Sequence, residues 1–491
     1  VRIPGSSLRG MVRTLVEIVS FGKFNFFDDK LLYYRGLADQ GSLRQEYIKN
    51  MNSLASGKDK GKVTYNFNAG YLKKQGLKYF IIPAQVIGGQ QFKKIKREKG
   101  PNKQYCFQKN NNGSYRVISG PMPSKKHDWL INPPDFNQKP IEIPDIDILS
   151  YQNDSSRYAG KENDDRNKQD GDLLRMIRVY HDQLIPCFYV IWKDSEGRDR
   201  VSFGHTGYFR LAYKKAIGDH IPTVLKETAT LDIAEAIFGK LGEFAGRVFF
   251  EDAVVKPGEK TVFGEKVSPK VLGSPKPTTF QHYLEQEGVR TLSELKHWNS
   301  DAKIRGYKLY WHKDPKDQDW SEGRVIEDNV HTVIKPLKPG VQFKFTIRFE
   351  NLAAYELGAL LFVLDLPKGC YHKLGMGKPL GLGTIAISPK LLISDRKKRY
   401  TQLFSDLNWE LALRETESKQ FKEAFEKYVL KIVDKDGNLP SLWGHKRLKQ
   451  LATILNWNNT KQSNWPQKTR YLEREEFEKR PILNSPEKYT E

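Results

Sequence analysis

The stretch VRIPGSSLRGMVRTLVEI, residues 1–18, decides how the fold of the whole chain is interpreted. Apolar residues recur at intervals of three and four from Leu8 to Val19, which predicts an amphipathic helix over those residues. A helix so close to the first residue is typical of the second element of a fold. We therefore expect the first strand of this fold to lie ahead of Val1.

The start of this helix has the composition of an anion site. Ser6 or Ser7 is expected to cap the helix, and Gly5 lets the backbone of another molecule approach the free amides. Arg9 and Arg13 add positive charge, so the first turn predicts a phosphate-binding site. The alternative interpretation is an ordinary capped helix whose arginines are solvated.

Composition indicates a multidomain protein with a polyanionic partner. The chain has 491 residues, with 81 Lys and Arg against 59 Asp and Glu, and a net charge of +22. Aromatic residues make up 12% of the chain and supply flat side chains for stacking on bases, so nucleic acid is the favoured partner class. The alternative is that the excess charge only solvates a large surface.

Three cysteines, Cys106, Cys187 and Cys370, lie far apart and form no CxxC motif. Neither a disulfide framework nor a thiolate zinc site is expected, and a reducing compartment is favoured. No apolar run reaches the length of a membrane span. The sequence therefore predicts a cytoplasmic protein without a membrane partner.

The order of patterns along the chain predicts an α+β fold. VQFKFTIRFE, residues 341–350, alternates apolar and polar side chains as a half-buried strand does, and a helix follows over residues 352–364. Together with the first helix, these elements predict a ferredoxin-like (RRM-like) core. The expected segments are the first part of the core at 1–57, a β-rich insertion at 58–200, the rest of the core at 201–400 and a helical C-terminal region at 401–491.

A second candidate site is the glycine-rich loop HKLGMGKPLGLG, residues 372–383. Its glycines allow the backbone to approach a ligand, while its lysines supply charge for phosphate. The residues concerned are Gly375, Gly377, Gly381 and Gly383, with Lys373 and Lys378. Because Pro379 follows Lys378 where a P-loop has Ser or Thr, nucleotide hydrolysis is disfavoured. The alternative is a flexible hairpin loop.

A basic and aromatic cluster, residues 208–215, is suited to stacking on bases and contacting phosphates. It contains Tyr208, Arg210, Tyr213, Lys214 and Lys215. An edge strand with solvated lysines explains the same pattern equally well.

Four further polar residues are weaker candidates for catalysis. His205 and His282 are suited to acid–base chemistry in a metal-free ribonuclease, although a structural or RNA-contacting role is favoured for each. Glu251 and Asp252 are candidate metal ligands, but two solvated carboxylates at the end of a strand are the favoured interpretation.

Four segments in this order resemble the RAMP superfamily, whose members form the guide-RNA-binding backbone of CRISPR effector complexes. They are IPGSSLRGMVRTLVEI at 3–18, IFGKLGEFAGRVFFEDA at 237–253, LGSPKPTTFQHYL at 272–284 and HKLGMGKPLGLGTIAI at 372–387. The glycine-rich loop before the last strand is the signature of that superfamily. The long β-rich insertion is similar to that of type III-D subunits.

The resemblance implies a crRNA-binding backbone subunit of a type III effector, with target RNA and other RAMP backbone subunits as partners. The implied RNA contacts are Ser6, Ser7, Arg9 and Arg13, and the loop from Gly375 to Gly383. In such subunits the acid that cleaves target RNA lies in a loop after the first strand. That region would precede Val1, so no catalytic residue is assigned, and no cofactor is expected unless catalysis calls for a divalent metal.

Two alternatives to this function stay open. One is a RAMP endoribonuclease that matures guide RNA, or that cleaves target RNA with an acid ahead of Val1. The other is a sequence-independent binder of single-stranded nucleic acid.

Overall fold

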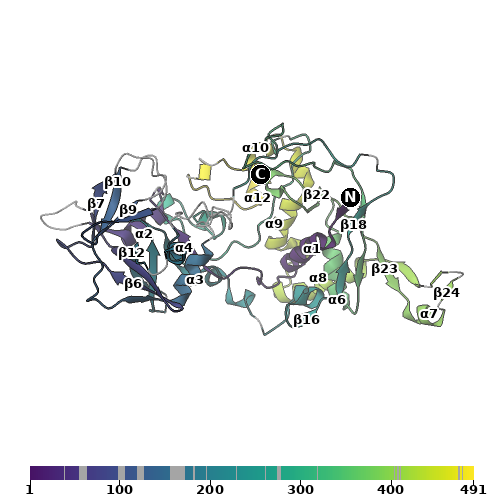
Figure 1. The fold of residues 1–491 in the computed structure, drawn as a ribbon. Coiled ribbons are helices and arrows are strands. Elements are labelled where there is room, and N and C mark those ends of the chain that lie inside the picture. Colours follow the sequence, from purple (N-terminus) through teal and green to yellow (C-terminus); the bar gives the residue numbers. More distant parts are fainter. Residues whose placement is uncertain are drawn as a thin grey trace.

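The computed structural model shows two lobes joined through several chain crossings (Figure 1). It describes residues 1–37, 39–54, 63–97, 106–118, 126–154, 172–180, 183–194, 196–227, 229–259, 261–273, 278–317, 319–402, 404–405, 408–409, 411–473, 476–477 and 479–490. One lobe is rich in strands, and we call it the β-rich lobe. The other, the mixed lobe, contains the first helix and the C-terminal helices.

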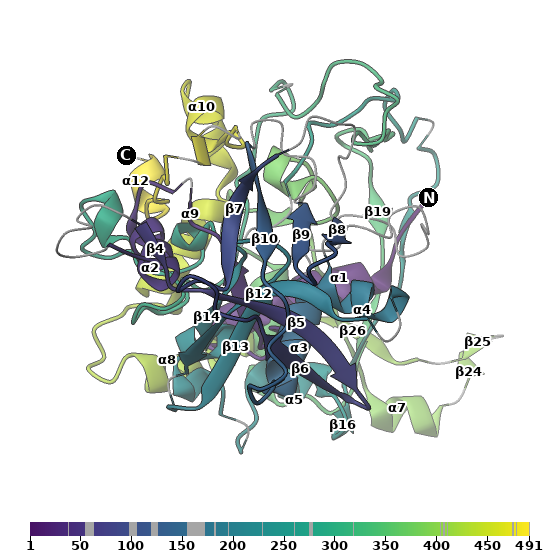
Figure 2. The ribbon, with the colours of Figure 1, turned by 60° about the vertical axis from the view of Figure 1, so that its left-hand side comes forward.

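The β-rich lobe is built from two antiparallel sheets, seen in Figure 2. The first has the order β11-β6-β5-β12-β13, with β5 at Asn68–Gln75, β6 at Lys78–Pro83, β11 at Ile141–Ile143, β12 at Ile185–Lys193 and β13 at Asp199–Gly204. The second has the order β7-β10-β9-β8, with β7 at Phe92–Lys96, β8 at Cys106–Lys109, β9 at Tyr115–Ile118 and β10 at His127–Ile131.

Smaller elements complete this lobe. They are β2 at Leu31–Tyr34, α2 at Ser42–Met51, β3 at Asn52–Leu54, β4 at Val63–Tyr65, α3 at Asp145–Asn153, α4 at Leu173–Val179 and β14 at Leu211–Ala216. Helix α4 contacts β5 and β12 and so covers part of the larger sheet.

Aromatic side chains form the core of the β-rich lobe. The rings of Phe67 and Phe92 stack with centroids 5.2 Å apart, and Trp129 and Phe188 pack against Phe92. The same hydrophobic cluster includes side chains from residues 34–51 and from residues 280–298. The lobe thus reaches beyond the expected 58–200 on both sides, and parts of that range lie outside the described residues.

The mixed lobe is built on a bent antiparallel ladder. Its strands are β1 at Arg2–Ile3, β17 at Val248–Phe250, β18 at Ala253–Val255, β19 at Phe343–Lys344 and β20 at Ile347–Phe349. Strand β18 lies between β1 and β19, and β17 pairs with β20. The strand expected over 341–350 is therefore present as two pieces, interrupted at residues 345–346.

Helices cover this ladder. Helix α1, Gly5–Val19, confirms the helix predicted from residues 8–19 and contacts α6, Ala354–Leu364. Helix α6 in turn contacts α8, Lys419–Val433. The two helices approach closely at Gly358, where an added Cβ would lie 2.0 Å from the carbonyl oxygen of Phe421.

The remaining elements are short. They are α5 at Ile233–Phe238, β15 at Gly239–Lys240, β16 at Phe244–Ala245, β21 at His372–Lys373, β22 at Thr384–Ile385, α9 at Lys446–Leu455, α10 at Trp465–Thr469 and α12 at Glu487–Thr490. An arm protrudes from the mixed lobe (Figure 1) and contains β23 at Leu391–Ser394, α7 at Arg396–Thr401, β24 at Phe404–Ser405, β25 at Asn408–Trp409 and β26 at Leu413–Thr416.

A two-residue strand, β1, precedes α1, where no strand had been expected within the chain. This strand pairs antiparallel with β18, because Arg2 lies opposite Val254 and Ile3 opposite Ala253. The mixed α and β content agrees with the α+β prediction, and a further strand ahead of Val1 stays a prediction.

Among the described residues, no helix is long and apolar enough to cross a membrane.

Candidate nucleic-acid interface

The glycine-rich loop connects β21 to β22, which pair antiparallel with His372 opposite Ile385. Its four predicted glycines all have positive φ, at 95° for Gly375, 66° for Gly377, 100° for Gly381 and 80° for Gly383. L-residues with a side chain rarely adopt this region of backbone space. At Gly383 an added Cβ would also lie 1.9 Å from the carbonyl oxygen of Leu374. The loop therefore has a defined backbone shape that depends on glycine.

Lys373 holds this loop together from inside. Its Nζ donates hydrogen bonds to the carbonyl oxygens of Gly381, at 2.5 Å, and Leu382, at 3.0 Å. Burial, aided by the positive charges of Lys313 and Lys378, lowers the pKa of Lys373 to about 7. The ammonium predicted to contact phosphate thus binds loop carbonyls instead.

Lys313 is a third lysine at this loop, and it was not among the residues predicted from the sequence. The residue is 8% exposed, and its side chain covers Gly381, where an added Cβ would lie 2.7 Å from the lysine Cδ. The neighbouring His312 ties this segment to the loop, since its Nδ1 lies 2.9 Å from Thr384 Oγ1. The signal in the sequence is the run YWHKD, residues 310–314, which places a basic residue next to aromatic residues.

The start of α1 lies beside this loop. Leu8 of α1 and Leu374 of the loop belong to one small hydrophobic cluster with Ala253. The structure thus brings together the two stretches that the sequence predicts to bind phosphate.

The capping of α1 differs from the prediction. Neither Ser6 nor Ser7 caps the helix; both are exposed, and the first amide, that of Gly5, donates to Asp252 Oδ1 at 2.8 Å. An added Cβ at Gly5 would lie 2.3 Å from the carbonyl oxygen of Phe250. Gly5 therefore serves close packing on a strand of the same chain. Asp252, interpreted as a solvated carboxylate, supplies the acceptor.

Both arginines of α1 are engaged within the chain. Arg9 Nη2 donates to the carbonyl oxygen of Phe238 at 2.6 Å, and burial lowers the pKa of Arg9. Arg13 Nε donates to Glu17 Oε1 at 2.9 Å, and its guanidinium lies 4.4 Å from the ring centroid of Phe26. Arg9 thus joins α1 to Phe238, whereas Arg13 is held within the helix by Glu17 and packs on Phe26, and neither sequence interpretation gave them these roles.

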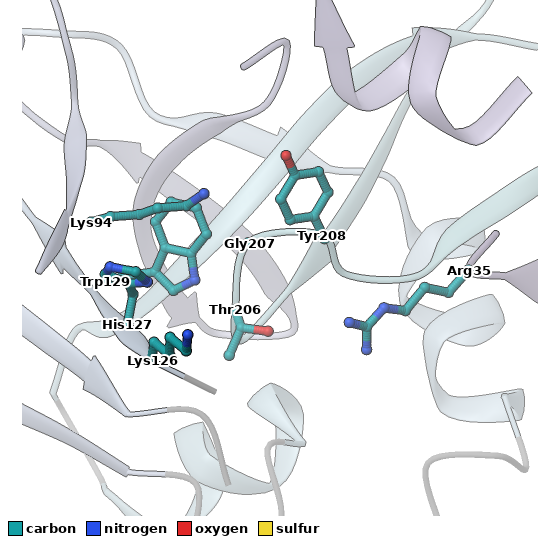
Figure 3. A pocket seen from close by; sticks show the side chains of 8 residues that line it. All are labelled: Arg35, Lys94, Lys126, His127, Trp129, Thr206, Gly207 and Tyr208. Atoms are coloured by element: carbon teal, nitrogen blue, oxygen red, sulfur yellow. The ribbon is translucent and has the colours of Figure 1, made fainter. Parts of the chain in front are cut away.

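The basic and aromatic cluster at 208–215 is divided by the fold. Tyr208 lines a pocket of the β-rich lobe (Figure 3). Arg210 lies 3.6 Å from Asp154, and Tyr213 is buried in the lobe core. Lys214 is exposed, and its backbone amide donates to Asn299 Oδ1 at 2.6 Å. These residues therefore do not form one binding surface.

Residues 157–386 match the family model of the RAMP superfamily. This range contains the ladder strands β17 to β20, helix α6 and the whole glycine-rich loop, whereas α1 lies outside it. The match supports a RAMP protein and suggests a CRISPR-associated RNA-binding function. A comparison with curated proteins finds none that matches the chain.

The two candidate histidines of the RAMP-matched segment contact backbone carbonyls. His205 Nε2 lies 3.1 Å from the carbonyl oxygen of Ile118 in the β-rich lobe. His282 Nε2 lies 3.0 Å from that of Pro481, and burial lowers the pKa of His282. These contacts favour the structural interpretation of both residues.

The acidic residues of the same segment are likewise engaged. Glu251 Oε1 lies 3.5 Å from Arg348 Nε, and Asp252 accepts the Gly5 amide. Over the part of the chain that the structure describes, no group of three or more His, Cys, Asp or Glu side chains is arranged to hold a metal ion.

Proposed function

We propose that this chain binds guide RNA as a backbone subunit of a type III CRISPR effector complex, with target RNA and other RAMP backbone subunits as partners. The observation that carries the proposal is the RAMP match over residues 157–386, which contains a glycine-rich loop of defined shape surrounded by lysines. The net charge of +22 supports a polyanionic partner. The three cysteines are free, which supports a reducing, cytoplasmic location.

The loop site, defined as residues 374–383 with Lys313, Lys373 and Lys378, has the properties of a phosphate cradle. Its tip is open, since Met376 is 87% exposed. Lys313 and Lys373 lie beneath the loop, where protein covers most of their side chains, and they contribute positive charge from there. Lys378 is half-buried and makes no ion pair among the described residues, so we assign the direct phosphate contact to its ammonium.

The proposal extends to the topology and subtype of the protein. The order of α1, strands β17 and β18, strands β19 and β20, α6 and β22 supports a ferredoxin-like core. The separate β-rich lobe supports a type III-D-like subunit that carries an insertion.

The test measures binding of a labelled single-stranded RNA to the full chain by fluorescence anisotropy over a series of salt concentrations. Each phosphate contact contributes about 0.7 to the slope of log K against log salt for single strands. Lys378→Ala is expected to lower that slope by about 0.7, whereas Lys435→Ala, a control at an exposed lysine of the C-terminal region, leaves it unchanged. Equal slopes for the two variants would overturn the loop site, and absence of RNA binding would overturn the function.

A further inference from the structure

A pocket in the β-rich lobe gathers four basic side chains from three separate segments. Arg35 follows β2, Lys94 lies on β7, and Lys126 and His127 are at the start of β10. All four are exposed. Among the described residues, no carboxylate lines this pocket, and none of Arg35, Lys126 and His127 forms an ion pair. The pocket therefore presents concentrated positive charge without a counterion from its own walls.

The floor of the pocket is aromatic and rigid. Trp129 is 4% exposed, and its ring packs against Phe92 and Phe188 with centroids 5.5 and 5.3 Å away. Gly207 lies directly on this ring, since an added Cβ would be 2.4 Å from Trp129 Cζ2. The Lys94 ammonium is 5.3 Å from the centroid of the same ring. A cation–π contact with Trp129 thus holds the Lys94 ammonium over the ring.

The walls carry groups suited to a base and a sugar. Tyr208 is half-buried and has φ of 58°, an uncommon conformation for a bulky residue. Its ring packs edge-on against Tyr65 and Phe67, and Figure 3 shows it pointing away from Thr206 at the rim of the pocket. Figure 3 also shows Arg35 directed toward Thr206 from the side opposite Lys126. Thr206 presents a hydroxyl at the centre of the pocket.

We propose that this pocket binds one nucleotide of a single-stranded RNA. The phosphate lies among Arg35, Lys94 and Lys126, the base stacks on Tyr208, and the Thr206 hydroxyl hydrogen-bonds the ribose 2′-hydroxyl. A base can enter such a pocket only when it is unstacked, which selects single strands over duplex. The inference rests on the proposed RNA-binding function but assigns a second contact, in a different lobe from the loop site.

The experiment uses the full chain and a labelled 12-nucleotide single-stranded RNA. The double variant Lys94→Ala/Lys126→Ala is expected to weaken binding and to lower the salt slope by about 1.4, as two phosphate contacts contribute about 0.7 each. The matched control is Lys73→Ala/Lys74→Ala, which removes two exposed lysines from the far end of β5 in the same lobe. Equal affinity and slope for the two double variants would overturn the pocket.

Further arms identify the ligand. With RNA, Thr206→Val is expected to weaken binding about threefold or more, whereas with DNA of the same sequence it leaves affinity unchanged. A 4-thiouridine RNA is expected to crosslink within residues 206–208, which tests the stacking without any variant at Tyr208. Displacement of the RNA by micromolar AMP would overturn the strand assignment in favour of a free nucleotide.

The outcomes separate this site from the loop site. A lower salt slope for Lys378→Ala with no effect of Lys94→Ala/Lys126→Ala would overturn the pocket and leave the proposed function standing. Absence of RNA binding by the unmodified chain would overturn both.

Discussion

The backbone amide of Gly5 donates a hydrogen bond to Asp252 Oδ1 at 2.8 Å, across 247 residues of sequence. The carboxylate stands at the positive end of α1, where both the hydrogen bond and the helix dipole favour a negative charge. One side chain at a strand end thus does what a local cap does in other helices, and it joins the helix to the ladder.

Asp252→Ala is expected to lower the free energy of unfolding by about 1 kcal/mol, because the first amide of α1 loses its acceptor. Asp252→Asn keeps an oxygen at the same place and is expected to lose about half as much, since only the charge is removed. Urea denaturation of both variants gives the comparison. A loss for Asn as large as that for Ala would contradict the role of the hydrogen bond.

The stability of the protein is expected to depend on Lys373 above neutral pH. Its pKa is lowered to about 7 in the folded chain and returns to about 10.4 on unfolding, so the unfolded state binds more protons between these values. Stability from this group therefore rises with pH across that window, by at most about 1.4 kcal/mol per pH unit. Lys373→Met removes this contribution. Denaturation of both proteins at pH 7, 8 and 9 measures the difference, and parallel pH curves would refute it.

RNA affinity is expected to fall as the pH rises from 6 to 8.5. The ammonium of Lys373 attracts phosphate at the loop site, and the group loses its proton over this range because its pKa is about 7. Lys373→Arg stays charged throughout, so its affinity is expected to vary less with pH. Anisotropy titrations at constant ionic strength decide this, and the prediction fails if both proteins show the same pH dependence.

Gly383→Ala is expected to damage the loop more than Gly375→Ala. Both positions have positive φ, and each substitution therefore has a backbone cost of about 1 kcal/mol or more. Only at Gly383 does the new methyl group meet a backbone oxygen, whereas nothing lies within 4 Å of a Cβ at Gly375. Thermal unfolding and RNA affinity of the two variants separate backbone strain from collision, and equal losses would show that collision has no part.

Local sequence patterns predicted the structure where the contacts that determine it lie close together in the sequence. The spacing of Leu8, Val12 and Leu15 predicted α1 because one helical face must be buried, and all three are in the core. The glycines at 375–383 were interpreted as freeing the backbone to approach a ligand, and all four have positive φ, while the binding of a ligand stays a prediction. The strand pattern of the expected β-rich insertion likewise corresponds to the two antiparallel sheets of the β-rich lobe.

Local sequence patterns failed to predict contacts in which the partner residue comes from a distant segment of the chain. The rule for helix caps favoured Ser6 and Ser7, but the acceptor comes from Asp252, which no spacing near α1 reveals. Lys313 reaches the loop site from a segment without regular structure. The carbonyl partner of Arg9 comes from Phe238, more than 200 residues away, so the sequence pattern did not reveal it. The Glu17 partner of Arg13 lies one helical turn away and was visible in the sequence, but the pairing was not predicted.

The packing of α1 on α6 has a consequence for how the protein is made. Helix α1 ends at Val19 and its partner begins at Ala354, so the ribosome must add more than 300 residues before the two can meet. At about 5–20 residues per second this takes on the order of tens of seconds. The hydrophobic cluster of the β-rich lobe is complete by Trp298 and can collapse earlier. During synthesis the part of α1 that contacts α6 therefore stays uncovered until late, although α5 and β17 can pack on the helix earlier.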